Sequence, residues 1–425
     1  MTTNNLLPPP TDRQPSKLFA GLMTLAISLM PLAAAQTLRW KFAPFVVLFA
    51  GGIYVLLRYP ELRRIYLQAK SVLMVTVAFV FFCEFIVLVH YKEHAISALY
   101  PQTLIFIATA GAYLAGVRRQ YIWLAFSATG AFLGLAAWKQ CAIDGAQRAY
   151  GLNGGPWSAI EFGMYLLILG LMALNAALYR QTPFYQRLFH GLCFIVAVYG
   201  ALLTESRGPL IAFPIMANVL LFIRFVKKGH YTRTILCLML GFSACLAIGV
   251  SLKPELVGRF TAIFQEAESY NAQSNATGSI RERLEMWRAA LLALREHPLI
   301  GIGPGKFGAY ITSHVHEGLL NPSITHYKHA HNEYLEAATT TGIFGLMLLI
   351  SIFIVPLRFF ITHLNHNNPS CAQAARAGVM LTGMYMLCGC SDNVFYRAMP
   401  HTFYFFIMLG LSVWICESKE ITHDA

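Results

Sequence analysis

Three short polar segments carry the residue types that can do chemistry in this chain, and each stands at the end of a long apolar run. They are residues 204–208 (TESRG), 329–333 (HAHNE) and 390–397 (CSDNVFYR). Ionisable groups at such positions are functional candidates, because a charge beside a membrane interior is costly to keep. Histidine can take up a proton near neutral pH, which makes it a candidate general base.

Local sequence predicts how these residues are held. Asn332 is a favourable N-cap, so His331 should lie immediately before the first turn of a helix. A Gly-Pro pair follows Arg207 and permits a tight turn into the next helix. The third segment places Asp392 and Arg397 in the connection between the last two apolar runs. Each segment alone can be explained as a helix cap or a topology charge, but all three on one face would form a site.

The composition indicates what kind of protein must position these segments. Of 425 residues, 56% are hydrophobic and only 12% are charged. An ordinary soluble domain has about 25% charged residues. Such a chain cannot cover a soluble surface, which excludes a soluble enzyme, a disordered chain and a collagen. Lipid must therefore cover much of the protein.

About twelve apolar runs can cross a hydrocarbon core, which takes about 20 helical residues. The runs cover residues 18–38, 42–57, 71–90, 99–117, 121–138, 158–179, 188–204, 209–226, 234–252, 333–357, 375–391 and 401–416. They are continuous and do not alternate with period 2, which favours helices over strands. We therefore predict an all-α polytopic membrane protein with a large, partly helical loop at residues 253–332, between helical regions at 1–252 and 333–425.

The positive charges set the orientation. Lys and Arg concentrate in the short segments on the side that holds both termini, which places that side in the cytoplasm and residues 253–332 outside. This bias and contacts with anionic membrane lipids explain the net charge of +12, so no nucleic acid partner is expected. Residues 13–35 also resemble a cleavable signal peptide, whose removal would leave the remaining orientation unchanged.

The outer loop is predicted to contain a helix that Pro298 ends. One apolar stripe at helical spacing should bury it: Ile280, Leu284, Trp287, Leu291 and Leu294. Residues 301–308 then contain a G-x-G-x-x-G pattern. No strand precedes this pattern, so it predicts a turn between two surface helices rather than a dinucleotide site.

Histidines crowd the end of the same loop: His314, His316, His326, His329 and His331. Imidazoles at this spacing could supply ligands to a zinc ion. No cysteine joins them, and we expect neither a metal nor another cofactor.

The sequence resembles the O-antigen ligase family, within a wider group that includes O-antigen polymerases and some protein-glycosylating ligases. The resemblance is carried by residues 204–208, by 279–287 (SIRERLEMW), by 329–346 (HAHNEYLEAATTTGIFGL) and by 390–400 (CSDNVFYRAMP). It implies a GT-C-like glycosyltransferase of the bacterial inner membrane, with its active site on the periplasmic face. The donor would be a glycan on undecaprenyl diphosphate and the acceptor a sugar of lipid A–core, without a metal.

The resemblance also implies roles for individual residues. Four arginines would bind the diphosphate: Arg207, Arg283, Arg148 and Arg397. His331 would take the proton of the acceptor hydroxyl, with His329 as the second choice. Asn332 and Asp392 would support this base. Three alternatives stay open, namely an O-antigen polymerase, a protein-glycosylating ligase and a twelve-span transporter.

The orientation yields a test. A cysteine introduced at Asn275 should react with a membrane-impermeant thiol reagent in intact spheroplasts, because the positive bias places this loop outside. A cysteine at Gln181, in a segment assigned to the cytoplasm, should react only after lysis. Protection of position 275 until lysis would overturn the orientation.

Overall fold

A computed structural model describes residues 14–35, 42–90, 99–152, 158–225 and 279–423. The longer helices are α1 (Lys17–Ala34), α2 (Phe42–Arg58), α3 (Pro60–Tyr66), α4 (Lys70–Val89), α5 (Leu99–Ala110), α6 (Arg119–Ala142), α7 (Ala159–Ala177), α8 (Phe184–Leu202), α9 (Arg207–Phe225), α12 (Ser279–Glu296), α13 (Phe307–His316), α14 (Glu333–Thr362), α15 (Pro369–Gly389) and α16 (Ala398–His423). Short 3-10 turns occupy Leu67–Ala69, Gly111–Leu114 and Pro322–Ile324. No strand occurs in these residues, so the predicted all-α class is confirmed.

Among the described residues, seven helical stretches are long and apolar enough to cross a membrane: Lys17–Ala34, Pro60–Val89, Arg119–Ala142, Ala159–Ala177, Arg207–Phe225, Glu333–Thr362 and Pro400–Lys419. Two shorter apolar helices, Phe42–Arg58 and Thr103–Leu114, accompany them. The protein is therefore a polytopic membrane protein. Each apolar run predicted from the sequence coincides with a helix except 234–252, which lies outside the described residues, as do residues 253–278 of the outer loop.

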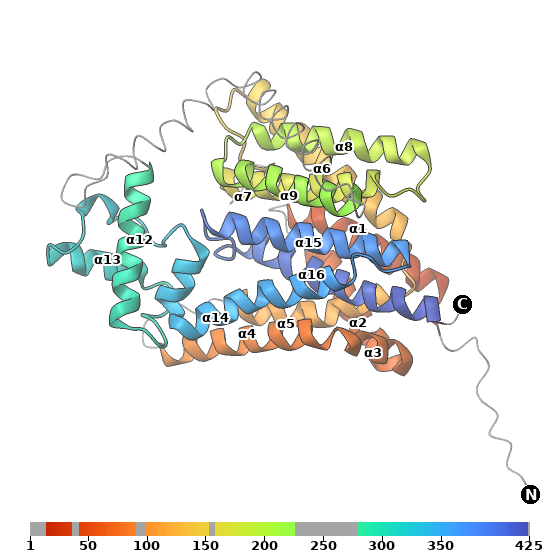
Figure 1. Ribbon diagram of the computed structural model, residues 1–425, viewed down its shortest axis with the longest axis horizontal. Helices are drawn as coiled ribbons and strands as arrows, with labels where there is room; N and C mark the ends of the chain where they lie inside the picture. Colours follow the sequence, from red (N-terminus) through yellow and green to blue (C-terminus); the bar gives the residue numbers. More distant parts are fainter. Residues whose placement is uncertain (1–13, 36–41, 91–98, 153–157, 226–278, 424–425) are drawn as a thin grey trace, which may run out of the picture.

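The bundle is built around α7 and α16, whose apolar segments are each 89% buried. Helix α7 packs against α6, α8, α9 and α15, and α16 packs against α5 and α15 (Figure 1). A helix that is apolar on every side needs apolar neighbours all round. Large apolar side chains on outer helices, such as Leu18, Phe81 and Phe184, are exposed, which fits a surface covered by lipid.

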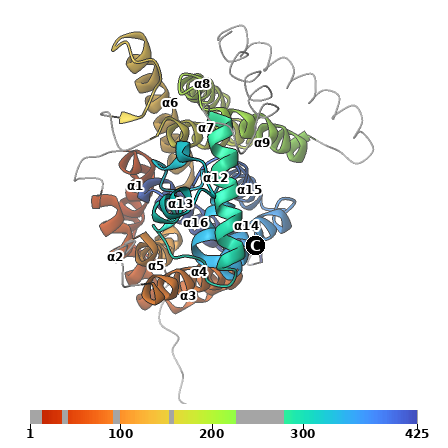
Figure 2. The same cartoon turned by 90° about the vertical axis from the view of Figure 1, so that its left-hand side faces the viewer.

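Helices α12 and α13 form a separate small unit across one end of the bundle (Figures 1 and 2). Its buried apolar residues are Met286, Ala289, Ala290, Ala293, Ile302, Phe307, Ile311, Leu320, Ile324 and Ala330. The predicted stripe on α12 is partly wrong, because Leu291 is 48% exposed. Helix α12 packs on α14, and its alanines allow that close approach where larger side chains would not.

Helix α14 is interrupted at Gly342, which has φ 69° and ψ −167°. The glycine-rich turn after α12 is hydrogen-bonded to the backbone beside this break. The amide of Ile302 donates to the carbonyl of Thr339 at 2.9 Å. The amide of Gly303 donates to the carbonyl of Thr340 at 3.0 Å. The turn predicted between two surface helices is thus confirmed, and it anchors the small unit to the bundle.

The break yields a prediction about stability. A Cβ at position 342 would lie 2.2 Å from the carbonyl oxygen of Leu299, and its backbone conformation is essentially confined to glycine. Gly342→Ala should therefore destabilise the protein by about 1–3 kcal/mol, visible as a lower thermal midpoint in detergent. Gly191→Ala on α8 is the matched control, since nothing lies within 4 Å of its added Cβ. Equal midpoints for the two variants would contradict this account.

Candidate active site

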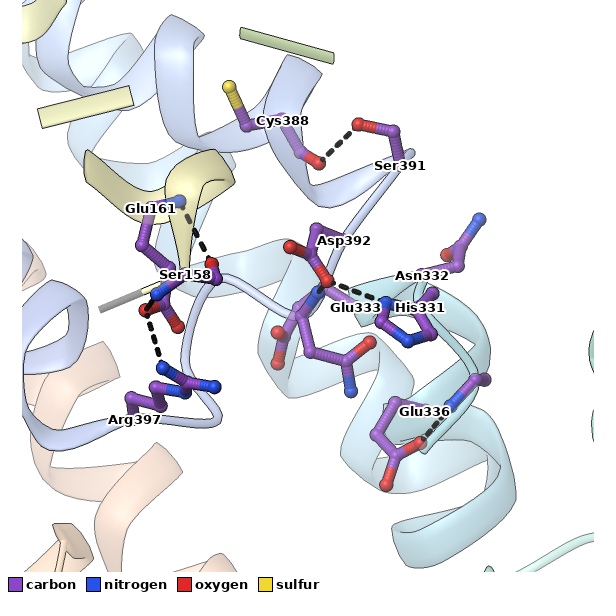
Figure 3. A network of polar contacts seen from close by, with 12 residues as sticks. Ser158, Glu161, His331, Asn332, Glu333, Glu336, Cys388, Ser391, Asp392 and Arg397 are labelled. Atoms are coloured by element: carbon purple, nitrogen blue, oxygen red, sulfur yellow. Dashed lines mark hydrogen bonds and ion pairs between the residues drawn. The ribbon is translucent and has the colours of Figure 1, made fainter. Parts of the chain in front are cut away.

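The centre of the site is a hydrogen bond between two residues that lie far apart in sequence. Nδ1 of His331 is 2.9 Å from Oδ1 of Asp392 (Figure 3). Burial raises the pKa of Asp392, but the hydrogen bond and charge of His331, the amide of Asn393 and the charge of Arg283 bring this pKa below its ordinary value. An ionised carboxylate only accepts hydrogen bonds. The hydrogen of this bond therefore lies on Nδ1, and Nε2 of His331 can accept a proton.

Asn332 fixes where His331 stands. Its Oδ1 accepts from the amides of Tyr334 at 3.0 Å and Leu335 at 3.1 Å, so it is the N-cap of α14 as predicted. Its Nδ2 donates to the carbonyl of Cys390 at 3.1 Å. His331 has a positive φ of 48°, which turns the chain sharply into the helix. One amide side chain thus joins the start of α14 to the segment that carries Asp392.

Two carboxylates in the first turns of α14 hold the adjoining segments. Oε2 of Glu333 accepts from the amide of Phe395 at 3.0 Å. Oε2 of Glu336 accepts from the amide of Ala330 at 2.8 Å. Neither acid was assigned a role from the sequence, although a first-turn position is favourable for a carboxylate. They fix the backbone on both sides of the His331–Asp392 pair.

Helix α12 supports the same segment from outside the bundle. Nε1 of Trp287 donates to the carbonyl of Ala330 at 3.1 Å. The hydroxyl of Tyr327 donates to Oε2 of Glu282 at 2.5 Å. The ring of Tyr327 meets that of His331 edge-on, with centroids 5.6 Å apart. Residues 279–287, whose sequence carried part of the family resemblance, therefore position the histidine segment.

His329 lies directly beside the pair. Its ring centroid is 4.2 Å from that of His331 and 4.6 Å from that of Tyr396. Burial, together with the nearby charges of His331 and Arg397, lowers the pKa of His329 to about 4, so this imidazole is neutral at neutral pH. One ligand atom each from His329, His331 and Asp392 lie within 4.8 Å of one another. Within the part of the chain that the structure describes, these three residues could hold a metal ion.

The 204–208 turn lies next to the segment that carries Asp392. A Cβ added at Gly208 would lie 2.1 Å from Oγ of Ser391, so the two segments are in close contact there. Arg148 is tied to the same turn: its Nε donates to the carbonyl of Thr204 at 2.9 Å and its Nη2 to Oγ of Ser206 at 3.4 Å. The structure thus brings residues 148, 204–208 and 391 to one end of the bundle.

Two further arginines approach from other elements. Nη1 of Arg397 is 3.4 Å from Oε2 of Glu161 (Figure 3). Glu161 also forms a capping box with Ser158 at the start of α7, and that S-x-x-E spacing was visible in the sequence. Arg283, on α12, contributes to the electrostatic field at Asp392.

The residues proposed from the sequence thus fall into two groups. The first is one contact cluster: His329, His331, Asn332 and Asp392. The second consists of arginines on four separate elements: Arg148 after α6, Arg207 at the start of α9, Arg283 on α12 and Arg397 before α16. The charges of Arg283 and Arg397 act on Asp392 and His329 respectively. A base oriented by a carboxylate, with guanidinium charge nearby, is suited to moving a proton beside an anionic substrate.

The chain resembles known proteins in this region. Residues 192–350 match the family model of O-antigen ligase. The expected family is thereby confirmed over this segment, which contains Arg207, Arg283, His329, His331 and Asn332. Arg148, Asp392 and Arg397 lie outside it.

A relative from Haemophilus influenzae, described as an uncharacterized protein, is 25% identical over 248 residues. The match spans 56% of this chain and 60% of the relative. The chain therefore covers less than two thirds of that protein's length. The similarity to a family of named function therefore rests on the O-antigen ligase match over residues 192–350.

Proposed function

We propose that this protein is an O-antigen ligase. It transfers O-antigen polysaccharide from undecaprenyl diphosphate to a sugar of lipid A–core, at the periplasmic face of the bacterial inner membrane, without a metal. The observation that carries the proposal is the His331–Asp392 pair at 2.9 Å, in a chain whose residues 192–350 match the O-antigen ligase family. This pair supplies the base that a sugar hydroxyl needs in order to act as a nucleophile.

The reaction requires one displacement. Nε2 of His331 takes the proton of the acceptor hydroxyl, while the hydroxyl oxygen attacks the anomeric carbon of the donor. The bond from that carbon to the diphosphate oxygen breaks, and its electron pair stays on the diphosphate. Asp392 holds Nδ1–H and stabilises the imidazolium that forms. A single direct displacement inverts the configuration at the anomeric carbon.

The leaving diphosphate gains negative charge, which guanidinium groups can stabilise through paired hydrogen bonds. We assign Arg207 and Arg283 to this task, since both lie in the family segment. Arg148 already donates to Thr204, and Arg397 already pairs with Glu161. These two arginines therefore fit a supporting role, in which they add positive charge without surrendering their protein contacts.

The same residues would serve an O-antigen polymerase or a ligase that glycosylates proteins, because the donor chemistry is shared. A transporter fits less well. Transporters place their polar sites near the membrane midplane, often at broken helices in repeated halves. Here the polar cluster lies at the start of α14. This is the end of the bundle that α12 and α13 cross (Figure 1).

Deletion of the gene and gel analysis of lipopolysaccharide test the function. If the protein is a ligase, lipid-linked O-antigen should accumulate and the lipopolysaccharide core should remain without O-antigen. Expression of the wild-type chain should restore O-antigen on the core. A core that carries a single repeat unit would identify a polymerase instead. An unchanged lipopolysaccharide with altered protein glycosylation would identify a protein ligase.

The arginine assignment predicts a loss when charge is kept but shape is changed. Arg207→Lys and Arg283→Lys retain the positive charge and lose the planar fork that binds phosphate oxygens in pairs. Both variants should insert normally and lose most transfer activity in the gel assay. Arg295→Lys on the exposed end of α12 is the matched control and should remain active. Near-normal transfer by the first two variants would reduce those arginines to topology charges.

The base assignment predicts a loss of rate without a loss of donor binding. His331→Ala should lower the transfer rate by about 10²–10⁴-fold, and Asp392→Asn should lower it in the same direction because the Nδ1–H form is no longer favoured. Donor binding, measured with purified protein and the lipid-linked glycan, should persist.

His314→Ala is the control for this series, since His314 stacks on Tyr310 within α13, in contact with Glu296. His329→Ala should be milder than His331→Ala. A larger effect at His329, or a collapse of donor binding in His331→Ala, would show that the base has been misassigned.

A further inference from the structure

One buried nitrogen at the centre of the site makes no hydrogen bond to any residue that the structure describes. This nitrogen is Nδ1 of His329. Leaving a buried polar atom unpaired is costly, so such an atom in a polar cluster points to a species that can occupy the space beside it. The ring that carries this nitrogen is tilted relative to that of His331, with the two centroids 4.2 Å apart.

His329 and two side chains beside its ring are metal ligands by type and by distance. His329, His331 and Asp392 each present one ligand atom, and these atoms lie within 4.8 Å of one another. Two imidazoles and one carboxylate favour zinc and similar transition metals over magnesium or calcium, which prefer oxygen. Three protein ligands leave a fourth position open, as in zinc sites that bind a water or a small ligand.

An ionised carboxylate stands beside the two rings. Oδ1 of Asp392 is 2.9 Å from Nδ1 of His331, and the pKa of Asp392 lies below its ordinary value. The guanidinium groups of Arg283 and Arg397 oppose a cation, but Arg397 is paired with Glu161 at 3.4 Å. The carboxylate of Asp392 is therefore the group that can balance the charge of a bound cation.

We propose that His329, His331 and Asp392 form a binding site for a zinc-like divalent cation, and that occupancy of this site blocks glycosyl transfer. The inhibitory half rests on the proposed function, in which His331 is the base. A cation on Nε2 takes the lone pair that would accept the proton. A cation on Nδ1 displaces the hydrogen shared with Asp392. In either arrangement the imidazole can no longer act, although the reaction itself needs no metal.

Cobalt(II) tests the site without any assay of activity, because its visible absorption reports coordination by imidazole. The purified full chain in detergent should give a cobalt band that Zn²⁺ abolishes. His329→Gln and Asp392→Asn should lose the band. His314→Gln and His326→Gln, which change histidines of the same loop outside the cluster, should keep it. Absence of a band in the wild type, or its survival in His329→Gln, would overturn the site.

The second arm measures transfer. Zn²⁺ should inhibit the wild type, and a chelator should restore the rate. Measured against its own uninhibited rate, His329→Gln should need at least about tenfold more Zn²⁺ for half inhibition, as expected when a metal site loses a residue that supports it. His314→Gln should match the wild type.

The two arms separate the possible failures. A cobalt band with no inhibition, or with stimulation by zinc, would overturn the inhibitory half. A cobalt band in a protein that shows no ligase phenotype on gene deletion would leave the cation site standing and overturn the proposed function.

Discussion

Carboxylates that accept backbone N–H groups hold the irregular segments at this end of the bundle. Each takes an amide from a loop or a helix flank: Glu285 from Asn321, Glu333 from Phe395, Glu336 from Ala330 and Asp392 from Asn393. Irregular backbone near a membrane must find partners within the protein, because lipid offers none. A carboxyl group does this well, since its oxygens accept amide N–H groups. The positions of His331 and Asp392 depend on this arrangement.

The interruption of α14 serves the same end. A continuous helix from residue 333 would keep its first turns in line with the membrane-spanning part of α14. The helix is instead interrupted at Gly342. The amides of Ile302 and Gly303 donate to the carbonyls of residues 339 and 340, which the interruption leaves without helical partners. The small α12–α13 unit is therefore joined to α14 at two levels, through the broken helix and through Trp287 on the histidine segment. Rigid support of this kind keeps a base within reach of a substrate atom.

Sequence alone was sufficient for features that depend on local chemistry. The helices followed from apolar runs, the α14 N-cap from Asn332, and the turn at 301–308 from its glycines. The sequence could not show which face of α12 is buried. Close packing against α14 selects the alanine face rather than the face with the larger apolar side chains. Nor could the sequence show that Arg397 meets Glu161, since the pairing depends on how α7 and the 390–397 segment pack.

The His331–Asp392 contact is a further feature that the sequence alone could not predict. Both residues were singled out by type and by resemblance, yet their separation of 61 positions left the sequence silent on whether they touch. The contact also required a positive φ at His331, a conformation that non-glycine residues adopt rarely and that sequence patterns do not predict. Such strain is kept where surrounding contacts enforce it, and here Asn332 and Glu336 do so.

The proposed base and the proposed diphosphate site need neighbouring charges of opposite sign. A base needs a negative partner for its imidazolium, whereas a diphosphate needs positive groups. An arginine bound directly to Asp392 would compete with His331 for the carboxylate. The structure separates these roles, because Glu161 engages Arg397 and the Thr204 carbonyl engages Arg148. Under the proposed function, the donor diphosphate would lie against the arginines. The acceptor hydroxyl would lie against His331 and Asp392, so that each meets charge of the sign it requires.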